Sequence, residues 1–266
     1  MGLSTFIGGV HPYEGKELSS DKPIQVIQPK GELVFPLSQH IGAPAKPLVA
    51  KGDTVLAGQK IAEAGGFISA NVICSVSGTV KGIEPRLMAN GSMVQSIIVE
   101  NDGEYRTVEG FGQKRDYTAL SKQEIRDIVK EAGIVGLGGA GFPTNVKLAP
   151  KNEEEIDYVI VNGAECEPYL TSDYRVMLEQ PEKVVGGLKV ILQLFDKAKG
   201  VIGIEENKPE AIRILSELVK DEPRIQVCTL KTKYPQGGER FLIYAVTGGR
   251  EINSTMLPAD AGCIVD

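Results

Sequence analysis

Short apolar runs alternate with longer amphipathic stretches through the second half of the chain. The pattern predicts strands at 156–161, 201–205 and 224–230. It predicts helices at 171–179, from Pro181 toward Gly200, at 207–220 and at 239–246. Asn207 is the expected N-cap of the third of these helices, because Pro209 then falls in its first turn. Strands that alternate with helices predict an α/β sheet with both faces covered.

The first half of the chain has a different pattern. Residues 1–32 are rich in Gly and Pro and predict an extended arm, whereas residues 33–105 contain short apolar runs broken by turns, which predict a small β domain. The order of strand and turn residues between Val49 and Val80 resembles the lipoyl and biotinyl carrier fold, a barrel-sandwich hybrid. Carrier domains hold a modifiable Lys at a hairpin tip. The corresponding stretch 64–68 has none, so no swinging arm is expected.

A polar connector at about 101–120 leads into a helix with a clear start signal. Ser121 and Glu124 have the spacing of a capping box, and Gly133 is the expected C-terminal stop.

The amino-acid composition argues against several classes of protein. The 266 residues are 42% hydrophobic and 24% charged, and the net charge of −6 gives no support to nucleic-acid binding. The chain contains no run of 18 apolar residues, so no transmembrane segment is expected, and Met1–Val10 does not resemble a secretion signal. The four cysteines form no C-x-x-C pair, so we expect no metal site and read them as reduced cytoplasmic thiols.

The segment Gly136–Lys147 contains a glycine run that fits G-x-G-x-x-G. A helix precedes it, and Pro143 falls where a dinucleotide-binding helix should run, so the ordinary Rossmann reading is rejected. Its backbone N–H groups and Lys147 suit a phosphate that the loop wraps directly. The alternative is a glycine-rich turn without a ligand.

Two further loops follow predicted strands. Asn162–Pro168 offers an amide and two carboxylates, which suit a polar ring system or a sugar, and Tyr234–Arg240 follows another strand. Because ligands of α/β sheets bind at the carboxyl ends of strands, these loops and the glycine run predict a pocket for a phosphorylated aromatic cofactor. The alternative for Glu165 and Glu167 is a solvated acidic loop. Cys166 between them is expected to point away as a packing residue.

The three motifs together resemble the FMN- and NADH-binding flavoprotein subunit of respiratory complex I. Gly8–Pro12, Pro36–Pro44 and Leu257–Asp266 extend the similarity over essentially the whole chain to a closer family, the RnfC subunits of the Rnf ion-translocating ferredoxin:NAD oxidoreductase. The resemblance implies the barrel-sandwich hybrid domain at 33–105 and a Rossmann-like α/β FMN- and NAD-binding domain of the complex I flavoprotein type at 118–266.

The same resemblance implies roles for individual residues. It assigns FMN contacts to Gly136, Gly138, Gly139, Lys147, Asn162, Glu165, Tyr234, Gly237, Glu239, Val265 and Asp266. Glu167 matches a catalytic carboxylate near the flavin and the nicotinamide, and Phe142 matches an aromatic ring that stacks on the nucleotide. Leu137, Ala164 and Gly238 stand where the complex I pattern has Arg, Asp and Glu, so each loses a polar contact.

The resemblance also implies a setting. An FMN-dependent NAD(H) oxidoreductase subunit is expected, peripheral at the cytoplasmic face of the membrane, with other Rnf subunits as partners and ferredoxin as an indirect one. Family members continue into a β-grasp-like domain and cysteine motifs for two [4Fe–4S] clusters. None of that precedes Asp266, so the clusters are expected only beyond this chain.

Two other functions remain open. The cobalamin reductase of diol-utilising microcompartments shares the glycine loop and the Asn162–Pro168 motif, but its flavin domain begins near the N-terminus, whereas a carrier-like domain precedes it here. A non-catalytic scaffold that docks partners through the β domain is the alternative from another class.

Overall fold

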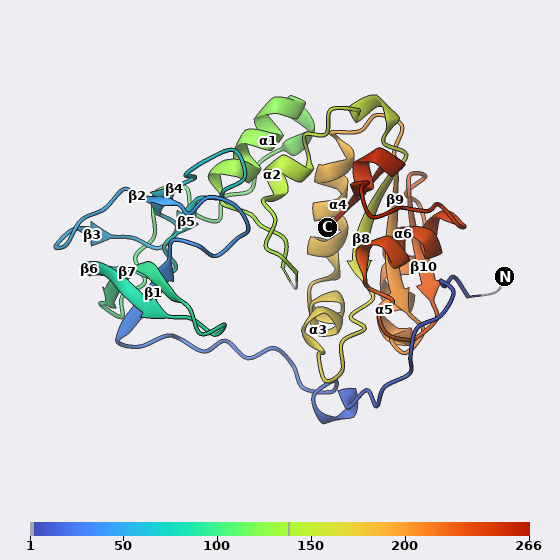
Figure 1. The fold of residues 1–266 in the computed structure, drawn as a ribbon, viewed down its shortest axis with the longest axis horizontal. Helices are drawn as coiled ribbons and strands as arrows, with labels where there is room; N and C mark the ends of the chain where they lie inside the picture. Colours follow the sequence, from blue (N-terminus) through green and yellow to red (C-terminus); the bar gives the residue numbers. More distant parts are fainter. Residues whose placement is uncertain (1–2, 138) are drawn as a thin grey trace. The chain divides into compact units, whose positions relative to one another are not determined.

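The chain folds as two compact units in the computed structural model (Figure 1), which describes residues 3–137 and 139–266. One unit comprises Met1–Val26 with Pro150–Asp266, and the other comprises Ile27–Ala149. We call them the α/β unit and the β unit and describe each by itself. The predicted domain boundaries near 32, 105 and 118 stay predictions.

The β unit contains two antiparallel sheets. One has the strand order β1-β7-β6-β3 and the other the order β2-β4-β5. The strands are β1 (Glu32–Pro36), β2 (Lys46–Pro47), β3 (Thr54–Val55), β4 (Lys60–Glu63), β5 (Val72–Ile73), β6 (Gly78–Leu87) and β7 (Met93–Asn101). Buried side chains of both sheets, including Phe35, Ile61, Val72 and Ile97, form one core. The two sheets thus bury their apolar faces against each other, and the match to the RnfC barrel sandwich hybrid domain confirms the predicted fold.

The helices of the β unit are α1 (Lys122–Glu131) and the short α2 (Thr144–Lys147). The predicted capping box is confirmed: Ser121 and Glu124 exchange hydrogen bonds at the start of α1. Gly133 follows α1 with a φ of 64°, and a side chain there would meet the carbonyl oxygen of Asn71 at 2.4 Å. The Asn71 amide also donates to the carbonyl of Lys130, so the end of α1 is fastened to the β sheets of its unit.

The α/β unit is built on a four-stranded parallel sheet with the order β10-β9-β8-β11. Its strands are β8 (Tyr158–Gly163), β9 (Lys199–Glu205), β10 (Ile225–Leu230) and β11 (Cys263–Val265), and its helices are α3 (Ser172–Glu179), α4 (Pro181–Leu192), α5 (Pro209–Leu218) and α6 (Glu239–Thr247). Single 3-10 turns lie at η1 (Lys16–Leu18), η2 (Tyr117–Ala119, in the β unit), η3 (Glu153–Glu155) and η4 (Pro258–Ala261).

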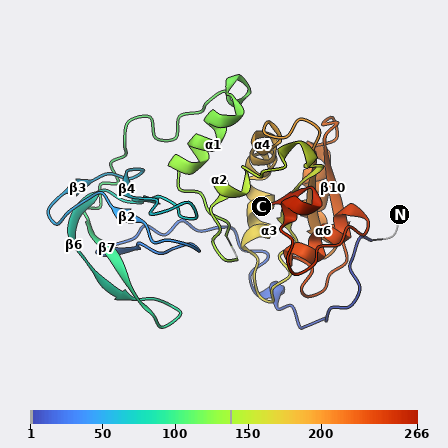
Figure 2. The ribbon, with the colours of Figure 1, turned by 45° about the horizontal axis from the view of Figure 1, so that its top comes forward.

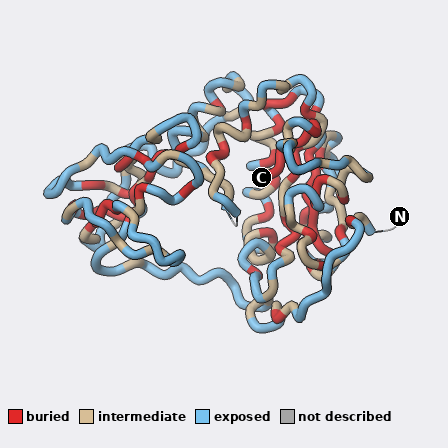
Figure 3. The backbone as a smooth tube through the Cα atoms, in the orientation of Figure 1, coloured by how far each residue is buried: buried red, intermediate tan, exposed pale blue. Residues whose placement is uncertain are grey.

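Helices cover both faces of this sheet, as predicted. A side chain added at Gly200 would touch Leu188 and Leu192 of α4, whereas one at Gly203 would touch Leu242 of α6. Successive strand residues point to opposite faces, and these two glycines are three residues apart, so α4 and α6 lie on opposite faces. Strand β9, inside the sheet, is buried between the helices along almost its whole length (Figure 3).

The strand order has a functional consequence. The chain steps from β8 to β9 to β10 in one direction and then returns to place β11 on the other side of β8. This reversal between β8 and β11 is a topological switch point, where ligands of open α/β sheets bind beside the carboxyl ends of the strands.

The N-terminal arm, residues 3–26, belongs to the α/β unit and is more than an extended segment. It pairs with the end of β10 through Ser4 and Leu230, pairs again through Val10 and Tyr234, and then forms the turn η1. Figures 1 and 2 show the arm running from β10 toward α3.

One local prediction was wrong. The N-cap of α5 is Lys208 and not Asn207. The Asn207 side chain is used elsewhere, because it donates to the carboxylate of Glu14 and accepts from the ammonium of Lys208.

Candidate functional site

Asn162 stands at the switch point of the α/β unit and joins three predicted site segments. Its backbone N–H donates to the carbonyl of Asp266 at 2.9 Å, just past β11. Its side-chain amide donates to the carbonyl of Gly237 at 2.9 Å, in the loop between β10 and α6. Residues separated by as many as 104 positions therefore meet at one edge of the sheet, where the sequence motifs predicted a site.

Gly237 is in close contact with the Asn162–Pro168 loop. A side chain there would lie 3.3 Å from the sulfur of Cys166 and 3.4 Å from both Ala164 and the Asn162 side-chain oxygen. The Gly237 N–H donates to the Cys166 sulfur at 3.2 Å. Cys166 thus holds the two loops together and does not simply pack away from them. Burial raises the pKa of its thiol, which favours the neutral form.

Glu167 is exposed and faces Tyr234 across the two loops. The negative charge of the Glu167 carboxylate, and then its hydrogen bond with the phenol, raises the pKa of Tyr234. The pair places a carboxylate and a hydroxyl donor side by side at the edge of the site, and Glu167 stays accessible to a ligand.

Glu165 is buried, and its carboxylate is engaged at the start of α3. One oxygen accepts from the N–H of Asp173 at 2.7 Å and the other from the N–H of Tyr174 at 3.4 Å. A carboxylate at a helix N-terminus satisfies donors that have no partner within the helix. Burial raises the pKa of Glu165 against the effect of these bonds. Its side chain therefore fixes the loop to α3.

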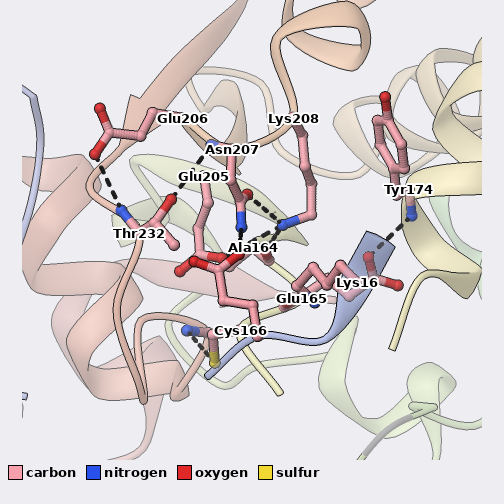
Figure 4. A network of polar contacts seen from close by, with 12 residues as sticks. Lys16, Ala164, Glu165, Cys166, Tyr174, Glu205, Glu206, Asn207, Lys208 and Thr232 are labelled. Carbon is pink, nitrogen blue, oxygen red and sulfur yellow. Dashed lines mark hydrogen bonds and ion pairs between the residues drawn. The ribbon is translucent and has the colours of Figure 1, made fainter. Parts of the chain in front are cut away.

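A buried ion pair lies beneath the same loop (Figure 4), and the sequence analysis missed it. Glu205 and Lys208 are each 1% exposed, with 3.3 Å between the carboxylate and the ammonium. The Lys208 ammonium also donates to the carbonyl of Ala164 at 2.7 Å and to the side-chain oxygen of Asn207 at 2.9 Å. Burial raises the pKa of Glu205 and lowers that of Lys208. The sequence signal for it is a charged pair three residues apart that begins at the last residue of a strand.

The glycine loop belongs to the β unit. The Gly136 N–H donates to the carbonyl of Phe142 at 2.9 Å, which closes the loop on itself. A side chain at Gly136 would lie 3.6 Å from the Lys147 ammonium, so that Lys reaches back to the start of the loop. A side chain at Gly139 would meet nothing within 4 Å, so its backbone is open to an approaching group. Gly138 lies outside the described residues.

The predicted site residues thus fall into two sets. The β unit brings together Gly136, Phe142 and Lys147, with Gly139 exposed between them. The α/β unit brings together Asn162, Glu167, Tyr234, Gly237 and Asp266. Glu239 is the first residue of α6, Val265 is the last of β11, and Glu165 supports the second loop from behind.

The parallel sheet, its switch point and the polar loops there define a nucleotide-binding type of α/β unit. The chain belongs to the Nuo51 FMN-binding domain family, whose sequence model matches residues 129–266. The model of the RnfC barrel sandwich hybrid domain matches residues 4–104.

Individual relatives agree with these assignments. The chain is 46% identical over 263 residues to the C subunit of the proton-translocating ferredoxin:NAD(+) oxidoreductase complex of Clostridium ljungdahlii, covering 99% of this chain and 57% of the relative. It is 46% identical over 264 residues to the C subunit of the Na(+)-translocating complex of Acetobacterium woodii, covering 98% and 59%. The chain therefore spans less than two thirds of the length of these relatives.

A solved structure of NAD+-reducing [NiFe]-hydrogenase in the air-oxidized state matches at 23% identity with a TM-score of 0.47, over 55% of this chain and 28% of that chain.

Within residues 3–137 and 139–266, none of the helices is both long enough and apolar enough to cross a bilayer.

Proposed function

We propose that the chain binds FMN and NAD(H) and transfers electrons between them as a subunit of an ion-translocating ferredoxin:NAD oxidoreductase. The observation that carries the proposal is the hydrogen-bonded junction of Asn162, Gly237 and Asp266 at the switch point of the parallel sheet. A ligand site is expected there on topology alone, and the family match names the ligand class.

The chemistry of the β-unit residues fits the phosphate end of FMN. Phosphate groups are bound by backbone N–H groups and by Lys, which acts as a point charge. The ammonium of Lys147 lies at Gly136, and the Gly139 backbone is exposed for close approach. We assign the phosphate and ribityl chain of FMN to Gly136, Gly138, Gly139 and Lys147.

The α/β-unit residues fit the ring end. The amide of Asn162 and the backbone around Gly237 and Asp266 present polar groups that can orient a flavin. Glu165 contributes by holding the loop, because its carboxylate oxygens already accept from α3. FMN, when bound, supplies the hydride acceptor and the conversion between two-electron and one-electron transfer.

Glu167 is the residue that we place beside the nicotinamide. It is exposed, and it forms a hydrogen bond with Tyr234 of the third loop. A carboxylate in this place can accept hydrogen bonds from the nicotinamide amide and favours positive charge on the ring. Phe142 is assigned to stacking on the nucleotide.

The names of the relatives support a proposal for the wider setting of this chain. The names of the two bacterial relatives describe ferredoxin:NAD(+) oxidoreductase complexes that translocate ions. We assign this chain to such a complex, with the other subunits as partners, a peripheral place at the cytoplasmic face of the membrane, ferredoxin as an indirect partner and [4Fe–4S] clusters outside residues 1–266. The RnfC barrel match at 4–104 favours this assignment over a cobalamin reductase.

The test is the substitution Glu167→Gln. It keeps the size of the side chain and one acceptor oxygen but removes the charge. We expect FMN to stay bound while reduction of the flavin by NADH slows, measured by stopped-flow bleaching of the flavin band in the full-length protein. Glu206→Gln, another exposed Glu in the α/β unit, is the control. Equal reduction rates and NADH affinity in Glu167→Gln and the parent would refute the role of Glu167.

A further inference from the structure

The ammonium of Lys16, in the N-terminal arm, is fully occupied by one loop of the candidate site. It donates to the carbonyl oxygens of Glu165 at 2.8 Å, Glu167 at 3.0 Å and Leu170 at 2.7 Å. An ammonium has three N–H donors, and here each has a carbonyl acceptor. Three carbonyls of a six-residue segment therefore converge on the single positive charge of a residue that lies 149 to 154 positions earlier in the sequence.

The loop needs such support because its backbone is strained. Glu165 and Tyr169 have φ values of 49° and 67°, a left-handed conformation that residues other than glycine rarely adopt. Residues in this conformation are strained and persist only when their surroundings hold them. The three hydrogen bonds from Lys16 hold the backbone of the segment that contains both strained residues.

Residues of the arm next to Lys16 also contact this loop, at Tyr169. The N–H of Tyr169 donates to the carbonyl of Glu14 at 2.7 Å. The ring of Tyr13 lies edge-on to the ring of Tyr169, with 6.2 Å between centroids. A side chain at Gly15 would meet the Tyr169 ring at 2.3 Å, and Gly15 has a φ of 61°. The arm therefore fits closely around Tyr169.

The arm also holds the third loop of the site. Val10 and Tyr234 exchange backbone hydrogen bonds of 2.9 and 2.8 Å. The ammonium of Lys233, which is 7% exposed, donates to the carbonyls of Phe6 and Gly8. The N-terminal arm thus holds both the loop that carries Glu167 and the loop that carries Tyr234.

We propose that the N-terminal arm is a clamp on the flavin site and that Lys16 is a positioning residue, which acts through the backbone of the Glu165–Leu170 segment. The inference rests on the proposed function. Lys16 touches no ligand in this account. It fixes the loop that follows Asn162 and presents Glu167, so FMN meets a preorganised site and does not have to order the loop on binding.

The test compares Lys16→Met with Lys22→Met in the full-length protein. Both substitutions remove an ammonium from the same arm, but among the described residues the Lys22 ammonium donates to the carbonyl of Leu18, within the arm itself. Two readouts are taken at a temperature where circular dichroism shows all proteins folded. One is hydrogen exchange of peptides that cover residues 163–171, and the other is the dissociation constant for FMN by fluorescence titration.

We expect Lys16→Met to speed exchange across 163–171 and to weaken FMN binding roughly tenfold, equivalent to about 1.4 kcal/mol, with Lys22→Met like the parent. Faster exchange with unchanged FMN affinity would make the contact merely structural and overturn the inference. An unchanged exchange rate across 163–171 in Lys16→Met would refute the proposal that the arm holds this loop. A parent that binds no FMN would refute the proposed function, whereas a parent that binds FMN no better than Lys16→Met would refute only the role of Lys16.

Discussion

Replacing Lys208 by Met is the sharpest test of how the site is held in place. The substitution keeps an unbranched side chain of similar length and removes a positive charge that is 1% exposed. Three acceptors lose their donor: the Ala164 carbonyl at 2.7 Å, the Asn207 side-chain oxygen at 2.9 Å and the Glu205 carboxylate at 3.3 Å. The Glu205 carboxylate keeps the N–H of Lys233 at 3.1 Å as its remaining described partner.

The expected cost follows from the charge that is left behind. Removing one partner of a buried ion pair typically destabilises a protein by about 3–5 kcal/mol, because the other charge stays buried without compensation. We therefore expect the free energy of unfolding of the α/β unit to fall by this amount. Urea titration monitored by far-UV circular dichroism measures it, because α3–α6 contribute most of the helical signal.

Two controls isolate the cause. Lys220→Met breaks a pair of the same type and spacing, Glu217 with Lys220, whose side chains are 67% and 56% exposed. An exposed pair contributes roughly 0–1 kcal/mol, so this variant should unfold close to the parent. Adding Glu205→Gln to Lys208→Met removes the uncompensated charge and should recover part of the loss. A Lys208→Met protein as stable as the Lys220→Met protein would refute the reasoning.

Three further outcomes are expected. Lys147→Ala should weaken FMN binding more at low than at high ionic strength, because a Lys acts on phosphate as a point charge, and equal affinity at low salt in titrations would place Lys147 outside the site. Bonds from Ser77 and then Arg106 lower the pKa of Asp102 from 3.8 to about 2, so its stabilising contribution is present above pH 3.8 and lost as the pH falls toward 2. The melting-temperature gap between the parent and Asp102→Asn should therefore close over that window, and a constant gap would contradict the assignment. Ser121→Ala should cost about 1 kcal/mol through loss of the α1 cap, measured by urea unfolding, whereas the exposed Ser92→Ala should cost less.

Elements with local causes could be predicted from the sequence. The helix α1 was found from Ser121, Glu124 and Gly133, because caps and stop signals act within a few residues. The strands β8, β9 and β10 and the four helices between and after them were found from apolar periodicity. Tyr234 lies past the end of β10, as predicted, whereas Asn162 is the penultimate residue of β8 and not beyond the strand, which continues two residues further than the predicted 156–161.

Contacts between distant segments could not be predicted. Lys16 lies in a stretch that reads as an extended arm, and its three acceptors are about 150 residues away, so no local pattern marks it. The N-cap of α5 moved from Asn207 to Lys208 because the Asn207 side chain finds Glu14 of the arm. Cys166 was expected to point away, but the close approach of Gly237 gives its sulfur a hydrogen bond. In each case a tertiary contact outweighs the local preference.

FMN binding by the purified protein tests the central claim most directly. The account predicts saturable binding of a single FMN per chain with quenching of flavin fluorescence, and much weaker binding of riboflavin, which lacks the phosphate that Lys147 and the glycine loop would hold. Titration of apo-protein with both compounds at low ionic strength gives the comparison. Absence of saturable FMN binding, or equal affinity for FMN and riboflavin, would contradict the account.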